Sequence, residues 1–291
     1  MHLAITDSGL GGLSICADVE RNLRRRHARD AVRITYVNAW PDEGTGYNDL
    51  PDAAARAAVF DRALRAIASL RPDRVLIACN TLSILYPLTE FSRTSDLPVH
   101  GIIDTGVDLF HEAMTDDPAR ILVVVGTKTT IEADVHRHRL IDRGVDSSRL
   151  AGQSCHGLAA AIESDPEGAR TASLIESCAA GAASHVPAGR SAFLGLCCTH
   201  YTYVAERLRA AMARQTGGDV RVLDPNRRLA ERAVPAFDGE ALAVEGTVTV
   251  SVVSKVPLTA HTRASLARLV AETSPATAEA LVSYVRIPDL F

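Results

Sequence analysis

Residues 74–81 read Arg74-Val75-Leu76-Ile77-Ala78-Cys79-Asn80-Thr81, a short apolar run that ends in a cysteine tripeptide. A second stretch has the same form, since the apolar run 192–196 leads into Cys198-Thr199-His200. A segment with helical character follows each of them. We therefore expect Cys79 and Cys198 at the carboxyl ends of buried parallel strands, each beside a helix N-terminus. Open α/β sheets bind ligands at such strand ends, and a helix N-terminus stabilises a thiolate.

Strand and helix signals alternate along the chain, which is typical of α/β layers built on largely parallel strands. The expected strands are 3–6, 33–37, 75–78, 99–103, 121–125, 191–196 and 220–223. The expected helices are one that begins near 13 and the segments 52–70, 81–91, 107–114, 131–143, 157–163, 168–184, 203–214 and 261–282. Residues 245–254 alternate Thr or Ser with Val, a pattern that predicts an antiparallel or edge strand.

The composition limits the class of protein. The chain has 291 residues, of which 47% are apolar, enough for two domains with a core each. A net charge of −4 with well-mixed acidic and basic residues argues against nucleic acid or a membrane surface as partner. The sequence has no apolar run long enough for a membrane span and no signal-peptide pattern. The six cysteines form no Cys-x-x-Cys pair, so we expect no metal site and a reduced, cytoplasmic protein.

A polar turn, Asp7-Ser8-Gly9-Leu10-Gly11-Gly12, follows the first expected strand. It lacks the lysine of a phosphate loop and the glycine spacing of a dinucleotide site. Two interpretations remain open: Asp7 caps the next helix, or the turn holds Asp7 and Ser8 at the strand end as site residues. Thr127 and Thr130 present the same choice after the strand 121–125, as helix caps or as donors to a ligand carboxylate.

Cys79 and Cys198 differ from the other cysteines in their neighbours. A Thr and an amide or imidazole side chain accompany each, and these groups can bind a carboxylate or support a thiolate. Of the remaining cysteines, Cys16, Cys178 and Cys197 fit packing positions, whereas Cys155 either packs or approaches a site. Taken alone, His200 fits a helix-start histidine and Glu163 a surface residue.

With these residues assembled, the chain resembles the aspartate/glutamate racemase superfamily, and most closely the glutamate racemases. The matching motifs run in order across nearly the whole length: Asp7-Ser8-Gly9-Leu10-Gly11-Gly12, Ala78-Cys79-Asn80-Thr81, Gly126-Thr127-x-x-Thr130, Cys198-Thr199-His200-Tyr201 and Leu223-Asp224-Pro225. Each motif alone is weak, but their order and spacing together are specific.

The resemblance implies a fold of two pseudo-symmetric open parallel-sheet α/β domains, with the active site in the cleft between them. The first domain would comprise residues 1–97 with 208–291, and the second, inserted domain residues 98–207. The resemblance also implies that no cofactor is needed and that the protein forms a homodimer.

The resemblance further assigns roles to residues. Cys79 and Cys198 would act as an acid/base pair on opposite faces of the substrate α-carbon, assisted by Asp7, His200 and Glu163. The substrate's amino and carboxylate groups would be bound by Ser8, Asn80, Thr81, Thr127, Thr130 and Thr199.

The sequence departs from the family pattern at several positions. Glutamate racemases carry Pro-Tyr-Gly in the loop after the second strand, whereas loop 38–51 here lacks that tripeptide and has Tyr47 near its place. The Gly before the second catalytic cysteine is Cys197, and the Pro after His-Tyr is Thr202. The Ser and Tyr that follow the middle turn are Ala133 and His136.

Our hypothesis from the sequence is a cofactor-independent two-cysteine racemase, an isomerase that converts L-glutamate to D-glutamate for peptidoglycan precursor synthesis. One alternative is a racemase, isomerase or decarboxylase of the same superfamily acting on another small acid such as aspartate. The other alternative is a non-catalytic protein that keeps the site as a sensor. The two retained thiols favour the racemase, because a decarboxylase needs only one proton-donating cysteine.

Overall fold

The computed structural model describes residues 1–25, 31–233 and 246–291, which form two compact units. Unit 1 comprises Met1–Ile102 and Asn226–Phe291, and unit 2 comprises Ile103–Pro225, so the second unit is an insertion in the first. The expected division placed 208–225 with the first domain. These residues belong to unit 2, because the strand β8 (Val220–Leu223) pairs with β7 (Ala192–Cys197) in the sheet of that unit.

The sheet of unit 1 has six parallel strands in the order β10-β9-β2-β1-β3-β4. Their bounds are β1 (His2–Asp7), β2 (Val32–Asn38), β3 (Arg74–Ile77), β4 (Val99–Gly101), β9 (Val248–Ser254) and β10 (Val285–Arg286). The strand expected over 245–254 begins in part outside the described residues, and its predicted direction is wrong. It runs parallel to β2, and on its other side the two-residue β10 pairs with Val253 and Ser254 alone.

Helices follow the strands of unit 1 in the manner of a parallel sheet. They are α1 (Leu13–Arg25), α2 (Ala53–Ser69), α3 (Asn80–Leu85), α4 (Phe91–Thr94), α11 (Pro225–Ala233), α12 (Ala260–Ala271) and α13 (Pro275–Val282), with 3₁₀ turns η1 (Tyr47–Asp49) and η2 (Tyr86–Leu88). The spacing of the apolar side chains explains the first helix, since Leu13, Val19 and Leu23 are all fully buried.

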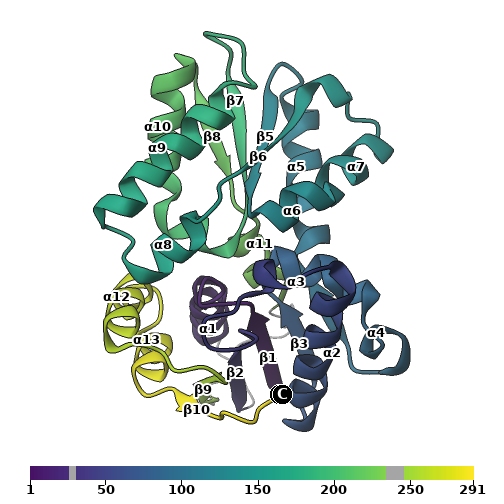
Figure 1. Cartoon of the computed structure of the whole chain (residues 1–291), viewed down its shortest axis with the longest axis vertical. Coiled ribbons are helices and arrows are strands. Elements are labelled where there is room, and N and C mark those ends of the chain that lie inside the picture. Colours follow the sequence, from purple (N-terminus) through teal and green to yellow (C-terminus); the bar gives the residue numbers. More distant parts are fainter. Residues whose placement is uncertain (26–30, 234–245) are drawn as a thin grey trace. The chain divides into compact units, whose positions relative to one another are not determined.

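Unit 2 has a four-stranded parallel sheet in the order β6-β5-β7-β8, which adds β5 (Ile121–Gly126) and β6 (Leu150–Ser154) to the two strands already given. Its helices are α5 (Ile102–Asp116), α6 (Lys128–Ala133), α7 (Val135–Asp142), α8 (Leu158–Ser164), α9 (Ala169–Ala183) and α10 (Ala205–Thr216), with 3₁₀ turns η3 (Ser147–Arg149) and η4 (Thr199–Val204). Figure 1 shows α9 and α10 on one face of this sheet and α5 on the other.

Three local differences from the expected elements have physical causes. Strand β6 was not expected, because Leu150-Ala-Gly-Gln-Ser154 offers little apolar signal at the sheet edge. The helix expected over 131–143 is broken at Asp134, whose φ of 50° lies in the left-handed region. The helix expected over 261–282 is two helices, because Ser274 caps α13 by accepting from the Thr277 N–H, and Pro275 opens it.

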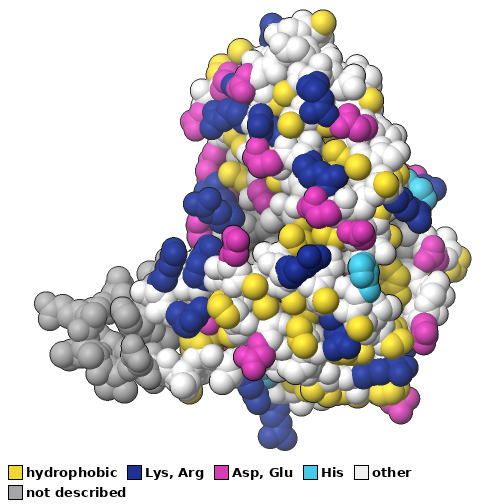
Figure 2. Space-filling model, turned by 90° about the vertical axis from the view of Figure 1, so that its left-hand side faces the viewer, with side chains coloured by type: hydrophobic (Ala, Val, Ile, Leu, Met, Phe, Trp, Pro, Cys, Tyr) yellow, Lys and Arg dark blue, Asp and Glu magenta, His cyan; other side chains and the backbone are white. Residues whose placement is uncertain are grey.

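On the face drawn in Figure 2, acidic and basic side chains are intermixed, with apolar side chains between them. In the described parts of the chain, no helix combines the length and the apolar character that crossing a membrane would need.

Candidate active site

The first cluster of site residues lies at the carboxyl ends of β1 and β3. The two strands are paired neighbours, with Thr6 opposite Ile77, so the residues that follow them also lie side by side. Ser8 follows β1 and Cys79 follows β3, and the Ser8 Oγ lies 3.1 Å from the Cys79 Sγ. Cys79 is also the N-cap residue of α3, as the apolar run and its tripeptide predict. We call Asp7, Ser8, Cys79, Asn80 and Thr81 the Cys79 cluster.

The glycine turn holds Asp7 in this cluster. The Asp7 Oδ2 accepts a hydrogen bond of 2.6 Å from the Gly12 N–H, so the carboxylate does bind the start of the helical turn. The approach is so close that a Cβ on Gly12 would lie 2.8 Å from the Ala78 Cβ and 2.9 Å from the Asp7 Oδ2. The two interpretations of Asp7 are therefore compatible, because its carboxylate fixes the turn and lies beside the thiol.

The surroundings of Cys79 favour a protonated thiol in the free protein. Burial raises the pKa of the Cys79 thiol above its ordinary value, and the negative charge of Asp7 raises it further. Hydrogen bonds from the Ser8 hydroxyl and from the backbone N–H groups of Leu82 and Ser8 act in the opposite direction but do not outweigh burial. Cys79 can therefore serve as a proton donor that already has hydrogen-bond donors in place for its thiolate.

Two residues close to Cys79 are among the described buried side chains that have polar atoms without a hydrogen-bond partner. They are Asn80, at both atoms of its amide, and Tyr47, at its hydroxyl. Asn80 is 2% exposed and Tyr47 3% exposed, and Tyr47 packs in the same apolar cluster as Cys79. Buried polar groups normally bind something, so unsatisfied ones beside a buried thiol indicate where ligand atoms bind.

The loop 38–51 that carries Tyr47 is held to the carboxyl end of β9. The Asn38 Nδ2 donates to the Ser254 Oγ at 3.1 Å. The Lys255 Nζ donates to the Pro41 carbonyl at 2.8 Å and to the Asp42 carboxylate at 2.7 Å. Sequence reasoning did not find Lys255, because no motif surrounds it and its partners lie more than 200 residues earlier.

The second cluster lies at the carboxyl end of β7 in unit 2. Cys198 directly follows this strand and is the N-cap residue of η4. Its Sγ lies 3.8 Å from the His200 Nδ1, and the His200 Nε2 lies 2.7 Å from the Glu163 Oε2 on α8. The three side chains form a relay from thiol to imidazole to carboxylate. We call Glu163, Cys198, Thr199 and His200 the Cys198 cluster.

His200 is held in its charged form. Burial alone lowers the pKa of the imidazole, but hydrogen bonds and charge interactions with Cys198 and Glu163 outweigh it and hold the pKa well above its usual range. Glu163 therefore has a partner that its isolated sequence context did not indicate. The charged imidazole therefore lies between the Cys198 thiol and the Glu163 carboxylate.

The middle turn lies beside the Cys198 cluster. Gly126 at the end of β5 pairs with Cys197 at the end of β7, so the residues that follow each of them are neighbours. Thr127 is the N-cap residue of α6, and its side chain accepts from the Thr130 N–H. The Thr127 and Thr130 hydroxyls lie 3.1 Å apart, and Thr130 and Thr199 are both buried. The capping interpretation of Thr127 is therefore correct, and the hydroxyl groups still lie at the strand end.

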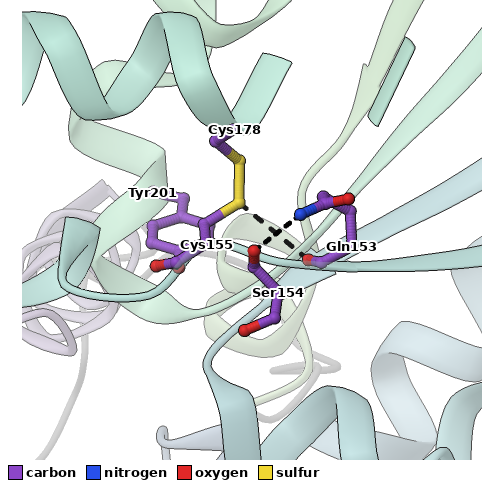
Figure 3. Close-up of a disulfide and its surroundings, with 5 residues drawn as sticks. All are labelled: Gln153, Ser154, Cys155, Cys178 and Tyr201. Carbon is purple, nitrogen blue, oxygen red and sulfur yellow. Dashed lines mark hydrogen bonds between the residues drawn. A yellow bond between two sulfur atoms is a disulfide. The ribbon is translucent and has the colours of Figure 1, made fainter. Parts of the chain in front are cut away.

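The remaining cysteines have distinct positions. Cys16 and Cys197 are fully buried, as expected of packing residues. Cys155 and Cys178 instead form a disulfide with a Cα–Cα distance of 5.2 Å, which corrects the expectation that all cysteines are reduced (Figure 3). The spacing of 23 residues contains no signal for this bond, which arises because α9 packs next to the turn after β6.

Figure 3 also shows Tyr201 beside this disulfide. The Tyr201 hydroxyl donates to the Cys155 carbonyl at 3.2 Å, and Tyr201 follows His200 directly. Within the described ranges of the chain, no three His, Cys, Asp or Glu side chains are grouped so that they could hold a metal ion.

Comparison with known proteins identifies a family and relatives that this chain resembles. Residues 8–233 match the Asp/Glu/Hydantoin racemase family. The glutamate racemase of Granulibacter bethesdensis is 30% identical over 234 residues, which cover 80% of this chain and 77% of that protein. The glutamate racemase of Campylobacter jejuni is 31% identical over 144 residues, but that alignment covers only 50% of this chain and 53% of that protein.

A solved structure shares the fold. The crystal structure of a glutamate racemase isoform from Bacillus anthracis superposes with a TM-score of 0.66 at 18% sequence identity. The superposition covers 91% of this chain and 92% of that chain. The fold of two parallel-sheet α/β domains that the sequence predicts is thereby confirmed.

Proposed function

The chain belongs to the Asp/Glu/Hydantoin racemase family, and on that premise we propose that it is a glutamate racemase, an isomerase that interconverts L- and D-glutamate. One observation carries the proposal. In each unit, a buried cysteine closely follows a strand of the sheet and has a polar neighbour. Cys79 lies beside Ser8, and Cys198 lies beside His200. Two thiols with acid/base partners are what inversion at an α-carbon needs when no cofactor is bound.

The protonation states suggest how the reaction starts. The raised pKa of Cys79 keeps this thiol protonated, and we assign the role of thiolate to Cys198, which lies beside the charged His200. In the proposed reaction, the Cys198 thiolate removes the α-proton from one face of the substrate and becomes a thiol. The Cys79 thiol gives its proton to the opposite face and becomes a thiolate. The product enzyme then has the complementary protonation state and accepts the other enantiomer.

The chemistry also requires stabilisation of a carbanion-like transition state. The α-proton next to a carboxylate is very weakly acidic, while an unperturbed thiol has a pKa of about 8.5. Oriented donors in a water-poor site provide such stabilisation. We assign this task to Ser8, Thr81, Thr127, Thr130 and Thr199, which would bind the substrate's carboxylate groups.

The substrate's polar groups would also satisfy the unpartnered side chains of unit 1. The Asn80 amide can donate to a carboxylate and accept from an ammonium group at the same time. The Tyr47 hydroxyl can donate to a carboxylate oxygen. Tyr47 would thus do part of what Pro-Tyr-Gly does in the glutamate racemases that the sequence resembles.

The decisive experiment is incubation of the purified protein with L-glutamate in deuterium oxide, followed by chiral chromatography and mass spectrometry. We expect D-glutamate to appear with deuterium at the α-carbon, and we expect the same rate after dialysis against a chelator and without added pyridoxal phosphate. Absence of both inversion and α-deuterium exchange would refute the proposal.

A second substrate is favoured by one observation, the altered loop 38–51. Aspartate is one methylene shorter than glutamate, and a loop in which Gly46 packs against Trp40 could narrow the site. A Cβ on Gly46 would lie 2.9 Å from the Trp40 ring, so this packing is close. Inversion of aspartate but not glutamate in the same assay would replace glutamate as the substrate and leave the two-thiol chemistry in place.

We further propose that the enzyme works in the cytoplasm as a homodimer and supplies D-glutamate for peptidoglycan precursors. The support is the family membership together with a net charge of −4 and well-mixed charges, which argue against nucleic acid or a membrane surface as partner. Light scattering of the purified protein tests the dimer, and loss of growth without external D-glutamate after deletion of the gene tests the role.

A further inference from the structure

The segment Cys198-Thr199-His200-Tyr201 is flanked by two residues that depart from the family pattern. Cys197 precedes it where a Gly is usual, and Thr202 follows it where a Pro is usual. A third departure, His136, lies 61 residues earlier in the sequence. The structure shows that all three side chains make polar contacts at the ends of this segment.

The first contact joins β7 to α7. The Cys197 Sγ lies 3.5 Å from the His136 Nε2, and both residues are buried. The Cys197 thiol faces α7 through His136, whereas Cys198 packs in a cluster of buried apolar residues that does not include Cys197, as the alternation of strand side chains predicts. The ring of Phe110 packs against His136 with centroids 5.9 Å apart, which restricts the imidazole.

This contact is neutral at ordinary pH. Burial lowers the pKa of His136 to about 4, so its imidazole is uncharged near neutrality. Burial raises the pKa of Cys197 well above its ordinary value, and the charges of Cys198 and Asp224 act in the same direction. Cys197 therefore stays a thiol. The contact can orient the strand end but does not supply a second base.

The second contact joins η4 to the end of β8. The Thr202 hydroxyl donates to the Asp224 Oδ2 at 2.5 Å. A hydrogen bond to a carboxylate is stronger than one between neutral groups. A Pro would restrict the backbone by its fixed φ, whereas Thr202 restrains the same position from its side chain.

We propose that His136, Cys197, Thr202 and Asp224 are positioning residues that hold the segment 198–201 from both ends and so set the place of Cys198 against His200. We call these four residues the clamp. The proposal rests on the proposed function for its meaning in catalysis, but its geometry is independent of which acid is the substrate. Small displacements of a catalytic group lower the rate by up to about 100-fold, so contacts that fix the position of Cys198 would raise the rate of the chemical step.

The first test compares two substitutions at one position. Thr202→Val removes the hydroxyl and keeps the shape, whereas Thr202→Ser keeps the hydroxyl. We expect Thr202→Val to lower kcat by about 10- to 100-fold with little change in KM, because a misplaced base affects the chemical step. The Thr202→Ser variant should keep most of the wild-type kcat, because it keeps the hydroxyl group. Equal losses in both variants, or no loss in Thr202→Val, would overturn the proposal.

The second test is a double-mutant cycle on the other contact. His136→Phe keeps a buried ring without the nitrogen, and Cys197→Ala removes the thiol. Because the two groups act through one contact, the double variant should lose no more activity than the worse single variant. Losses that multiply would contradict the proposal. Cys16→Ala is the control, since it removes a fully buried thiol from the core of unit 1.

A substrate-free measurement separates this proposal from the proposed function. The rate at which iodoacetamide alkylates Cys198, followed by peptide mass spectrometry over a pH series, reports the position of the thiol against His200. We expect the pH profile to change in Thr202→Val and His136→Phe but not in Cys16→Ala. If the wild-type protein fails to racemise glutamate while these profiles still differ, the proposed function falls and the clamp stands. Unchanged profiles in folded variants, checked by circular dichroism, would refute the clamp.

Discussion

At the scale of single residues, burial and the neighbouring side chains set the pKa values of Cys79 and His200. Cys79 has hydrogen-bond donors but lies beside a carboxylate, whereas His200 lies between Cys198 and Glu163. The two cysteine thiols therefore have different polar neighbours, a carboxylate beside Cys79 and a histidine beside Cys198. This difference would let one thiol start as donor and the other as acceptor, although both are nearly buried.

The pH dependence of stability follows from His200. The imidazole of an unfolded chain has a pKa of about 6.5, and the folded value lies well above it. A raised pKa stabilises the folded state fully below the unfolded pKa, and this stabilisation is lost as the pH rises through the folded pKa. We therefore expect Glu163→Gln to lower stability by about 1.5–3 kcal/mol near pH 6, the usual range for a hydrogen bond to a charged group.

Thermal melting over a pH series measures this effect. The loss in Glu163→Gln should shrink once the pH exceeds the folded pKa of His200. The control is Glu206→Gln, which removes an exposed carboxylate paired with Arg209 rather than with a histidine. A loss that stays constant over the whole pH range would show that Glu163 does not stabilise the imidazolium.

At the scale of elements, the loop 38–51 depends on contacts with β9 and the chain end. Lys255 bonds two groups of this loop, and its Nζ lies 4.9 Å from the centroid of the Phe291 ring. Lys255→Met removes the hydrogen bonds and keeps much of the side-chain length. We expect KM for glutamate to rise by about 3- to 10-fold, since the loop carrying Tyr47 loses charge-assisted bonds. Steady-state kinetics measures the effect.

The control for this variant is Lys128→Met, whose side chain is exposed and pairs weakly with Glu132 at 3.8 Å. An unchanged KM in Lys255→Met, or an equal rise in Lys128→Met, would exclude Lys255 as a support of the substrate loop. A fall confined to kcat would place its effect on chemistry rather than on binding.

The disulfide gives a second prediction at the scale of elements. Cys155 and Cys178 tie the turn before α8 to α9, and α8 carries Glu163. Cross-links over loops of this length typically contribute about 3 kcal/mol. We expect urea unfolding of the wild-type protein to show a loss of this size on adding dithiothreitol, and Cys178→Ala to show no such response. In the control variant Cys16→Ala, dithiothreitol should lower the free energy of unfolding by as much as it does in the wild type.

A thiol count supplies the direct check. Alkylation of the denatured, unreduced protein should label four cysteines, which are Cys16, Cys79, Cys197 and Cys198. Labelling of all six would show that the bond is absent from the purified protein.

At the scale of the whole molecule, Cys79 lies in unit 1 and Cys198 in unit 2, so each unit holds one of the two proposed catalytic thiols. Cys79→Ala and Cys198→Ala should each abolish racemisation, because each removes one of the two proton-transfer groups. If the two thiols of one chain act on one substrate, a mixture of the two inactive variants stays inactive. Recovery of activity on mixing and refolding them together would instead show that one site uses thiols from two copies of the chain.

Much of the fold was predictable because its signals are local. The runs before Cys79 and Cys198 are apolar and short, and a polar turn and a helical pattern follow them, so both strand ends were found. The break at Asp134 and the edge strand β6 were not found. A single left-handed residue leaves no periodicity, and a strand with little apolar content is stabilised by its pairing with β5.

By itself, the sequence determined two α/β units, the two strand-end thiols and the motifs of an amino-acid racemase. These features depend on periodicity and on residues close to one another in the chain. Only the tertiary structure decided the pairs Glu163 with His200, Cys155 with Cys178 and His136 with Cys197. Their members come from different helices and strands, and packing of those elements on one sheet brings them together. The contacts that set the charge and the position of the second thiol are therefore properties of the fold.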